Sequence, residues 1–158
     1  IANKNQPNAL GSVGHIEVSP NSRNVIAGNS LFTVDIRSPD INKLVKMENE
    51  LKQMTTDICK KYKIEFEMDQ IGGFDPVAFD KECLNNIRNS ANKFGYSHKD
   101  IVSGAGHDAC WINTVAPSAM IMCPCVDGLS HNEAEEIKPE WASSSTNVML
   151  HAAIASAT

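Results

Sequence analysis

The stretch of sequence that decides how this chain is interpreted is Ser103-Gly104-Ala105-Gly106-His107-Asp108-Ala109. A second informative stretch is Gly128-Leu129-Ser130-His131-Asn132. The two histidines flank an apolar run, residues 119–126, that is predicted to be a buried strand. Glycines let a ligand approach the backbone, and an imidazole can bind a metal ion or stabilise an oxyanion. Two such segments joined by one short strand therefore indicate a ligand site.

Length, composition and charge set the class of protein. The chain has 158 residues, enough for one domain with a core or for parts of two. Its 42% hydrophobic and 21% charged residues are typical of a soluble globular protein. The net charge of −5 and the lack of a basic run argue against nucleic acid as a partner. No apolar stretch has membrane-spanning length, and no signal-like start is visible, so no membrane partner is expected. Because the chain opens on Ile1, we expect the true N-terminus to lie elsewhere.

The cysteines point to a reducing compartment. Their number is odd and their contexts are mostly apolar, which suits reduced thiols in a cytoplasmic protein: Cys59, Cys83, Cys110, Cys123 and Cys125. Cys123-Pro124-Cys125 invites a metal interpretation, but it has no second pair to complete a site. The favoured interpretation is that Cys123 and Cys125 act as small hydrophobic residues in a buried strand.

The first half of the chain alternates between strand and helix patterns. Residues 13–18 and 31–37 have strand character, with a turn at 21–24 between them. In 31–37 every second residue is apolar, and the polar face ends in Arg37. Ser38-Pro39-Asp40 predicts a helix start, followed by helical spacing to Tyr62. Residues 62–68 then alternate as a further half-exposed strand, so this half is predicted to be part of an α+β sandwich layer.

Glycines and a proline at residues 72–76 mark a domain boundary, because they stop both periodicities. Beyond it, a helical stripe over 79–94 is closed by Gly95, and Pro139 starts a final helix. An apolar strand flanked by helices belongs to a sheet covered on both faces, so the second half is predicted to be α/β. The two domains are expected to cover residues 1–72 and 73–158.

Three sets of residues together resemble one known family. They are the stretch 103–109, the stretch 120–132, and Asn24-Val25-Ile26 with Val34-Asp35-Ile36-Arg37. In this order they resemble the C-terminal half of the N-carbamoyl-amino-acid amidohydrolases. These enzymes belong to the M20-type hydantoinase/carbamoylase group, which also includes β-ureidopropionase and allantoate amidohydrolase. The resemblance extends from about residue 11 to the end. It departs from the family pattern at Ala27, where proline is common, and at 143–146, which is unusually rich in serine.

The resemblance implies a fold and a set of partners. Residues 1–72 would be the second half of a lid domain that also dimerises, and residues 73–158 the C-terminal segment of an aminopeptidase-like metallohydrolase domain. The family holds two divalent metal ions, expected here to be Zn²⁺, Mn²⁺ or Co²⁺. Most of its metal ligands and its catalytic glutamate lie in an N-terminal half that this sequence does not contain. We therefore expect a homodimer whose missing half is needed for activity, and an isolated chain that is inactive.

The resemblance also assigns roles to individual residues. His131 resembles the last histidine ligand of the metal pair, and His107 the group that stabilises the oxyanion of the tetrahedral intermediate. Arg37 resembles the clamp on the substrate carboxylate, Asn24 its partner amide, and Gly106 a point of close backbone approach. In this family the lid residues serve the neighbouring subunit's site.

Each of these roles has a simpler alternative. His131 would be a loop histidine beside Glu133 and Glu135, His107 a structural cap, and Arg37 a solvated residue at a strand edge. The other acidic residues and histidines offer no substitute ligand set. Asp100, Glu133 and Glu135 lack the family spacing, and His15, His98 and His151 suit surface or core positions.

The predicted activity follows from the resemblance. The complete enzyme would cleave the ureido C–N bond of a small ureido substrate, either an N-carbamoyl-L-amino acid or N-carbamoyl-β-alanine. The products would be the amino acid, CO₂ and NH₃. Two alternatives remain open: an allantoate amidohydrolase, and a non-catalytic lid or dimerisation module.

Overall fold

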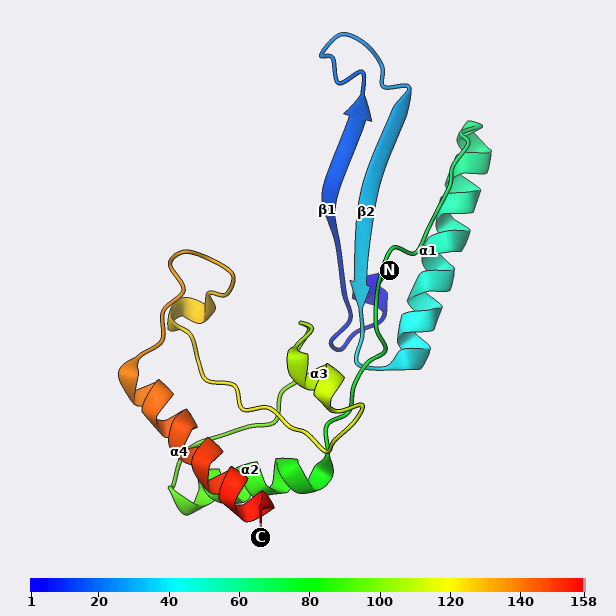
Figure 1. Cartoon of the computed structure of the whole chain (residues 1–158). Coiled ribbons are helices and arrows are strands. Elements are labelled where there is room, and N and C mark those ends of the chain that lie inside the picture. Colours follow the sequence, from blue (N-terminus) through cyan, green and yellow to red (C-terminus); the bar gives the residue numbers. More distant parts are fainter. Residues whose placement is uncertain (158) are drawn as a thin grey trace. The chain divides into compact units, whose positions relative to one another are not determined.

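A long antiparallel hairpin forms the frame of the N-terminal part of the chain (Figure 1). Strand β1 (Leu10–Ser19) pairs with β2 (Asn29–Arg37), with Leu10 opposite Arg37 and Ser19 opposite Asn29. A bulge at Gly14 shifts the register once. Both strands were predicted from their alternating pattern, and both are confirmed, each with longer bounds than expected. The computed structural model describes residues 1–157. The short 3-10 helix η1 (Ala2–Lys4) precedes the hairpin.

Helix α1 (Ile41–Tyr62) follows the hairpin and contacts β2. As predicted, Asp40 caps its start: the carboxylate accepts hydrogen bonds from the backbone N–H groups of Asn42 and Lys43 at 2.9 and 3.3 Å. Met47 is fully buried in this region. The helix ends because Lys63 adopts a left-handed conformation (φ 56°), where residues other than glycine are uncommon.

The C-terminal part is organised by two packed helices, α2 (Lys81–Lys93) and α4 (Pro139–Ser156). As predicted, Gly95 ends α2 with a positive φ, and Pro139 occupies the first turn of α4. Asp80 also caps the start of α2, a cap that was not predicted. Asn86 bonds to Ser156 at the end of α4, and Phe94, just after α2, packs edge-on against His151, one turn earlier in α4, with ring centroids 4.8 Å apart. These contacts show that the two helices run antiparallel. The short elements α3 (Asp108–Ile112) and η2 (Val126–Gly128) lie between them in sequence.

Two predicted strands are wrong. Residues 64–68 and 119–125 form no ladder within the described chain, and Tyr62 belongs to helix α1. A strand needs a neighbour to take its backbone hydrogen bonds, and only β1 and β2 are paired in the described residues. The sheet covered on both faces that was predicted for the second half is therefore absent from residues 1–157. Over the part of the chain that the structure describes, the fold is α+β, with a two-stranded sheet and four α-helices.

The chain divides into two units, described here separately. One unit contains Ile1–Pro76 and Val102–Gly104, and the other contains Val77–Ile101 and the chain from Ala105 onward. The assignment of these parts to a lid and a catalytic domain stays a prediction. Within the described residues, no helix is both long enough and apolar enough to cross a membrane. All five cysteines are free thiols.

Candidate functional site: Arg37 and the two glycine-histidine segments

Arg37 ends strand β2, and its guanidinium is held by two partners. Asp35, two residues earlier on the same strand face, accepts a hydrogen bond from Nε at 2.8 Å and another from Nη2 at 2.6 Å. The carbonyl oxygen of Gly104 accepts a bond from Nη1 at 2.7 Å. Arg37 and Asp35 are both about half-exposed, at 48% and 49% of their side-chain surface. The arginine is therefore anchored at the end of the strand by these bonds, while about half of its side chain stays exposed.

The charges of this pair reinforce each other. The hydrogen bonds from Arg37 lower the pKa of the Asp35 carboxyl, although partial burial opposes this shift. The same bonds raise the pKa of Arg37 above its already high value. Both groups are therefore ionised throughout the physiological pH range.

Gly104 begins the segment that leads to His107, and it packs closely against the base of the hairpin. A Cβ atom at position 104 would lie 2.6 Å from Cδ1 of Leu10, so only glycine fits unless Leu10 moves. Leu10 is the residue paired with Arg37, so both strand ends contact Gly104. The contact joins positions 67 residues apart in sequence and was not predicted.

Asn24 lies far from Arg37 within the same unit. It belongs to the loop that joins β1 to β2, and its side-chain oxygen accepts a hydrogen bond from Ser22 at 2.8 Å. The register places the Ser19–Asn29 pair eight residues along β2 from the Leu10–Arg37 pair. At about 3.4 Å per residue, this separation is roughly 27 Å. The structure therefore does not bring Asn24 and Arg37 together within one chain.

His131 lies in a closed loop between residues 126 and 136. The backbone N–H of Val126 donates to the carbonyl of Glu136 at 2.8 Å and joins the two ends of the loop. His131 has a left-handed backbone (φ 55°), which is costly for a residue with a side chain. Its N–H donates to Oε2 of Glu135 at 3.0 Å, which holds this conformation.

Glu135 has a second contact in the same loop. Its Oε1 accepts a weak hydrogen bond from the thiol of Cys125 at 3.8 Å. Burial raises the pKa of the Cys125 thiol, and the charge of Glu135 raises it further. Cys125 and Cys123 are half-buried and lie outside any strand, so the predicted buried-strand setting for this pair is wrong. Sequence reasoning noted Glu135 only as a neighbour of His131 and missed its structural role.

His107 occupies the position immediately before helix α3. Its backbone is extended, and its carbonyl accepts a hydrogen bond from the N–H of Cys110 at 2.9 Å. The backbone of His107 thus starts the helix, as the alternative of a structural cap proposes, whereas its side chain makes no capping bond. The side chain is half-exposed, and Gly106, just before it, is exposed.

The side chains that could bind a metal ion determine how much of a metal site this chain can form. The imidazole of His131 is exposed on an anchored loop, which suits a single nitrogen ligand. No group of three potential ligands forms anywhere in residues 1–157. The described residues therefore fit one ligand of a metal site and do not build a complete site.

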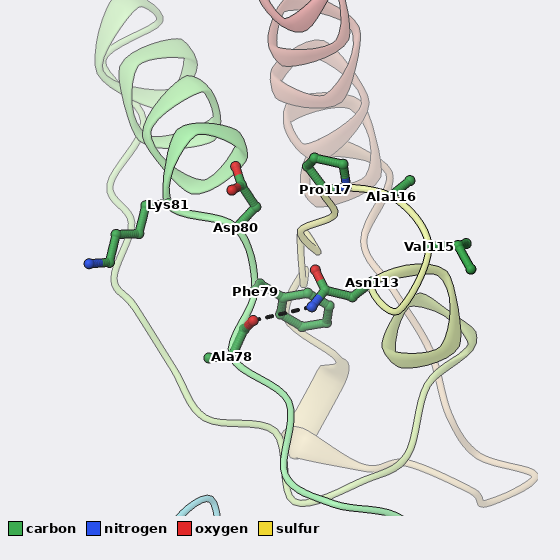
Figure 2. A pocket seen from close by; sticks show the side chains of 8 residues that line it. All are labelled: Ala78, Phe79, Asp80, Lys81, Asn113, Val115, Ala116 and Pro117. Atoms are coloured by element: carbon green, nitrogen blue, oxygen red, sulfur yellow. Dashed lines mark hydrogen bonds between the residues drawn. The ribbon is translucent and has the colours of Figure 1, made fainter.

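An open hollow of about 590 Å³ lies beside the start of α2 (Figure 2). At its rim, the side-chain amide of Asn113 donates to the carbonyl of Ala78 at 3.3 Å. Asp80 also lines it, but its carboxylate already caps α2 by accepting from the N–H of Cys83 at 2.9 Å. Because none of the predicted site residues lines this hollow, we assign it no catalytic role.

Comparison with known proteins identifies the class. The chain belongs to peptidase family M20/M25/M40, whose model matches residues 6–155. This confirms the predicted family resemblance. Amidohydrolases of this family are generally metal-dependent.

Individual relatives narrow the comparison within the family. N-carbamoyl-L-amino-acid amidohydrolase of Rhizobium meliloti is 51% identical over 157 residues, which are 99% of this chain and 38% of the relative. Allantoate amidohydrolase of Escherichia coli is 32% identical over 122 residues, which are 77% of this chain and 30% of the relative. A solved amidase of the hydantoinase/carbamoylase family from Burkholderia multivorans matches with a TM-score of 0.88 at 46% identity. That match covers 96% of this chain and 38% of the amidase. The chain thus spans less than two fifths of the length of these relatives.

Proposed function

We propose that this chain is the C-terminal part of a metal-dependent amidohydrolase that cleaves the ureido C–N bond of N-carbamoyl amino acids. Water adds to the ureido carbon, and the products are the amino acid, CO₂ and NH₃. The observation that carries this proposal is the 51% identity to an N-carbamoyl-L-amino-acid amidohydrolase along almost the whole chain. The region of identity includes both glycine-histidine segments.

Each proposed site residue has a chemical task that its position allows. The guanidinium of Arg37 binds the substrate carboxylate, because its planar fork matches two carboxylate oxygens. The imidazole of His107 donates to the oxygen that becomes negative when the ureido carbon turns tetrahedral. Exposed Gly106, just before His107, leaves room for the ligand beside the backbone.

His131 is proposed to be one ligand of a pair of divalent ions, Zn²⁺, Mn²⁺ or Co²⁺. When bound, these ions would polarise the ureido carbonyl and lower the pKa of the attacking water. The remaining ligands and the general base would come from the N-terminal half of the enzyme. The anchored loop around His131 supports this role, since a fixed ligand holds a metal more tightly than a mobile one.

The enzyme is proposed to be a cytoplasmic homodimer. Asn24 lies roughly 27 Å from Arg37, at the far end of the hairpin, so one chain does not supply both residues to the same substrate. We therefore propose that one of them acts in the neighbouring subunit's site. This differs from the expectation that all the lid residues act on the neighbouring subunit.

The test of this function replaces Arg37 by lysine in the full-length enzyme. Lysine keeps the charge but loses the planar two-point contact. Activity on N-carbamoyl amino acids is expected to fall about tenfold or more, because hydrogen bonds to charged groups contribute about 1.5–3 kcal/mol. A neutral ureido analogue should be hydrolysed slowly by both forms and change little. An equal loss on both substrates would refute the carboxylate clamp.

One further activity is supported by a specific relative, the 32% identical allantoate amidohydrolase. Allantoate also carries a carboxylate and ureido groups, so Arg37 would serve it equally well. The ratio of kcat/KM for allantoate to that for N-carbamoyl amino acids separates the two enzymes. A folded, metal-loaded full-length protein with neither activity would favour a non-catalytic dimerisation module.

A further inference from the structure

Arg37 uses three of its N–H donors within the protein. Nε and one donor of Nη2 bond to Asp35, and one donor of Nη1 bonds to Gly104. A guanidinium has five donors in a fixed plane. Two donors therefore remain, one on each terminal nitrogen, and two is the number of donors that a carboxylate can accept from a guanidinium.

The orientation of this fork depends on Asp35. Both of its oxygens are engaged, so the carboxylate fixes the plane of the guanidinium as well as its position. Gly104 accepts only one bond, which alone would allow rotation about that contact. An arginine that is not held in this way has many rotamers, and ordering them on binding would weaken the affinity for a ligand.

We propose that Asp35 is a positioning residue for the substrate: it fixes Arg37 so that the two remaining donors are held ready for the substrate carboxylate. The inference rests on the proposed function, because it requires Arg37 to be the carboxylate clamp. Nothing in the family match or the relatives' names assigns a role to Asp35.

The direction in which KM changes in the Asp35→Asn variant distinguishes a positioning role of Asp35 from a purely electrostatic effect of its charge. Asp35 is an anion next to the proposed site for another anion. If its only effect were its charge, Asp35→Asn would remove a repulsion and lower KM for a carboxylate substrate. If Asp35 positions Arg37, the same change frees the guanidinium and raises KM.

The experiment is steady-state kinetics of the full-length enzyme with an N-carbamoyl amino acid. For Asp35→Asn we expect KM to rise about fivefold or more with kcat little changed, because carboxylate binding is shared by the ground and transition states. Glu17→Gln is the matched control. It removes the same charge from the same face of the hairpin, where Glu17 pairs with His15 and not with Arg37. A general loss of folding would instead lower the apparent kcat at constant KM.

The Arg37→Ala variant distinguishes the clamp role of Arg37 from the positioning role of Asp35. If Arg37→Ala raises KM but Asp35→Asn leaves it unchanged or lowers it, the positioning role is wrong and the clamp stands. If Arg37→Ala itself leaves KM unchanged, the proposed clamp fails. When both roles hold, adding Asp35→Asn to Arg37→Ala should change KM no further, since Asp35 acts only through Arg37.

Discussion

Mixing pairs of inactive variants is expected to restore activity for only one of the two residues Asn24 and Arg37. The hairpin separates these residues by roughly 27 Å, which is several times the length of a carbamoyl amino acid. They cannot both contact one substrate from the same chain. We therefore expect one of them to act on the neighbouring subunit's substrate and the other on the substrate of its own subunit.

The expected magnitude follows from counting sites. When the residue that acts across the interface is replaced, an equal mixture of that alanine variant with His131→Ala gives heterodimers as half of all dimers, and each heterodimer holds one intact site of two. Recovery is therefore expected to be about one quarter of the activity of the unmodified dimer in the mixture and about one half in purified heterodimers. The mixture for the other residue should recover nothing, because both defects then spoil the sites of their own subunits.

Differently tagged subunits would be mixed, allowed to exchange, purified through both tags, and assayed with an N-carbamoyl amino acid. The two-tag purification shows that heterodimers have formed, so lack of activity cannot reflect lack of exchange. Recovery in both mixtures would refute the conclusion drawn from the separation of Asn24 and Arg37. Recovery in neither mixture would refute a role for either residue across the interface.

The remaining predictions concern the loop, a surface ion pair and the isolated chain. Glu135→Ala should weaken the binding of one metal ion by about 10–100-fold in the full-length enzyme, measured by titration with Co²⁺. His131→Ala should abolish binding at that site. Unchanged metal affinity in Glu135→Ala would contradict the anchoring role of Glu135. Asp100 bonds to Arg88 at 2.7 and 3.0 Å, which lowers its pKa. The pair should therefore stabilise the fold above the ordinary pKa of an aspartate and lose this effect as the pH falls through the lowered pKa. Asp100→Asn should lower Tm at neutral pH and match the unmodified protein at the acidic end; an equal difference at every pH would contradict this. The described chain has a solvent-accessible surface area of 12348 Å², compared with roughly 7800 Å² for a folded monomer of this mass. Residues 1–158 alone should therefore associate or fold poorly. Sedimentation as a monomer with one sharp melting transition would contradict this prediction.

Local signals in the sequence predicted helices α1, α2 and α4 and the two strands of the hairpin. Asp40 and Pro139 predict helix starts because capping and the first helical turn depend on a few neighbouring residues. The alternation in 31–37 gives β2 and also places Asp35 and Arg37 on one face. The link between these two residues could therefore have been found from their spacing alone.

Features that depend on distant residues were not predictable in this way. Residues 64–68 and 119–125 have strand-like patterns, yet pairing needs a second strand that no local pattern supplies. The bond from Arg37 to Gly104 joins two segments whose sequences show no sign of contact. The role of Glu135 depends on the left-handed backbone of His131, which an unremarkable histidine does not reveal.

The boundary between the two units has a practical consequence for dividing this polypeptide. The chain leaves the first unit at Pro76, returns for Val102–Gly104, and leaves again. A fragment that stops at Pro76 would lack the carbonyl that accepts a bond from Arg37 and the glycine that packs on Leu10. Both ends of the hairpin base would then be open to water. If the chain were expressed as two pieces divided after Pro76, residues 102–104 would be on the second piece although they pack with the first. A permuted or split gene should therefore be cut elsewhere, for example in the loop between β1 and β2.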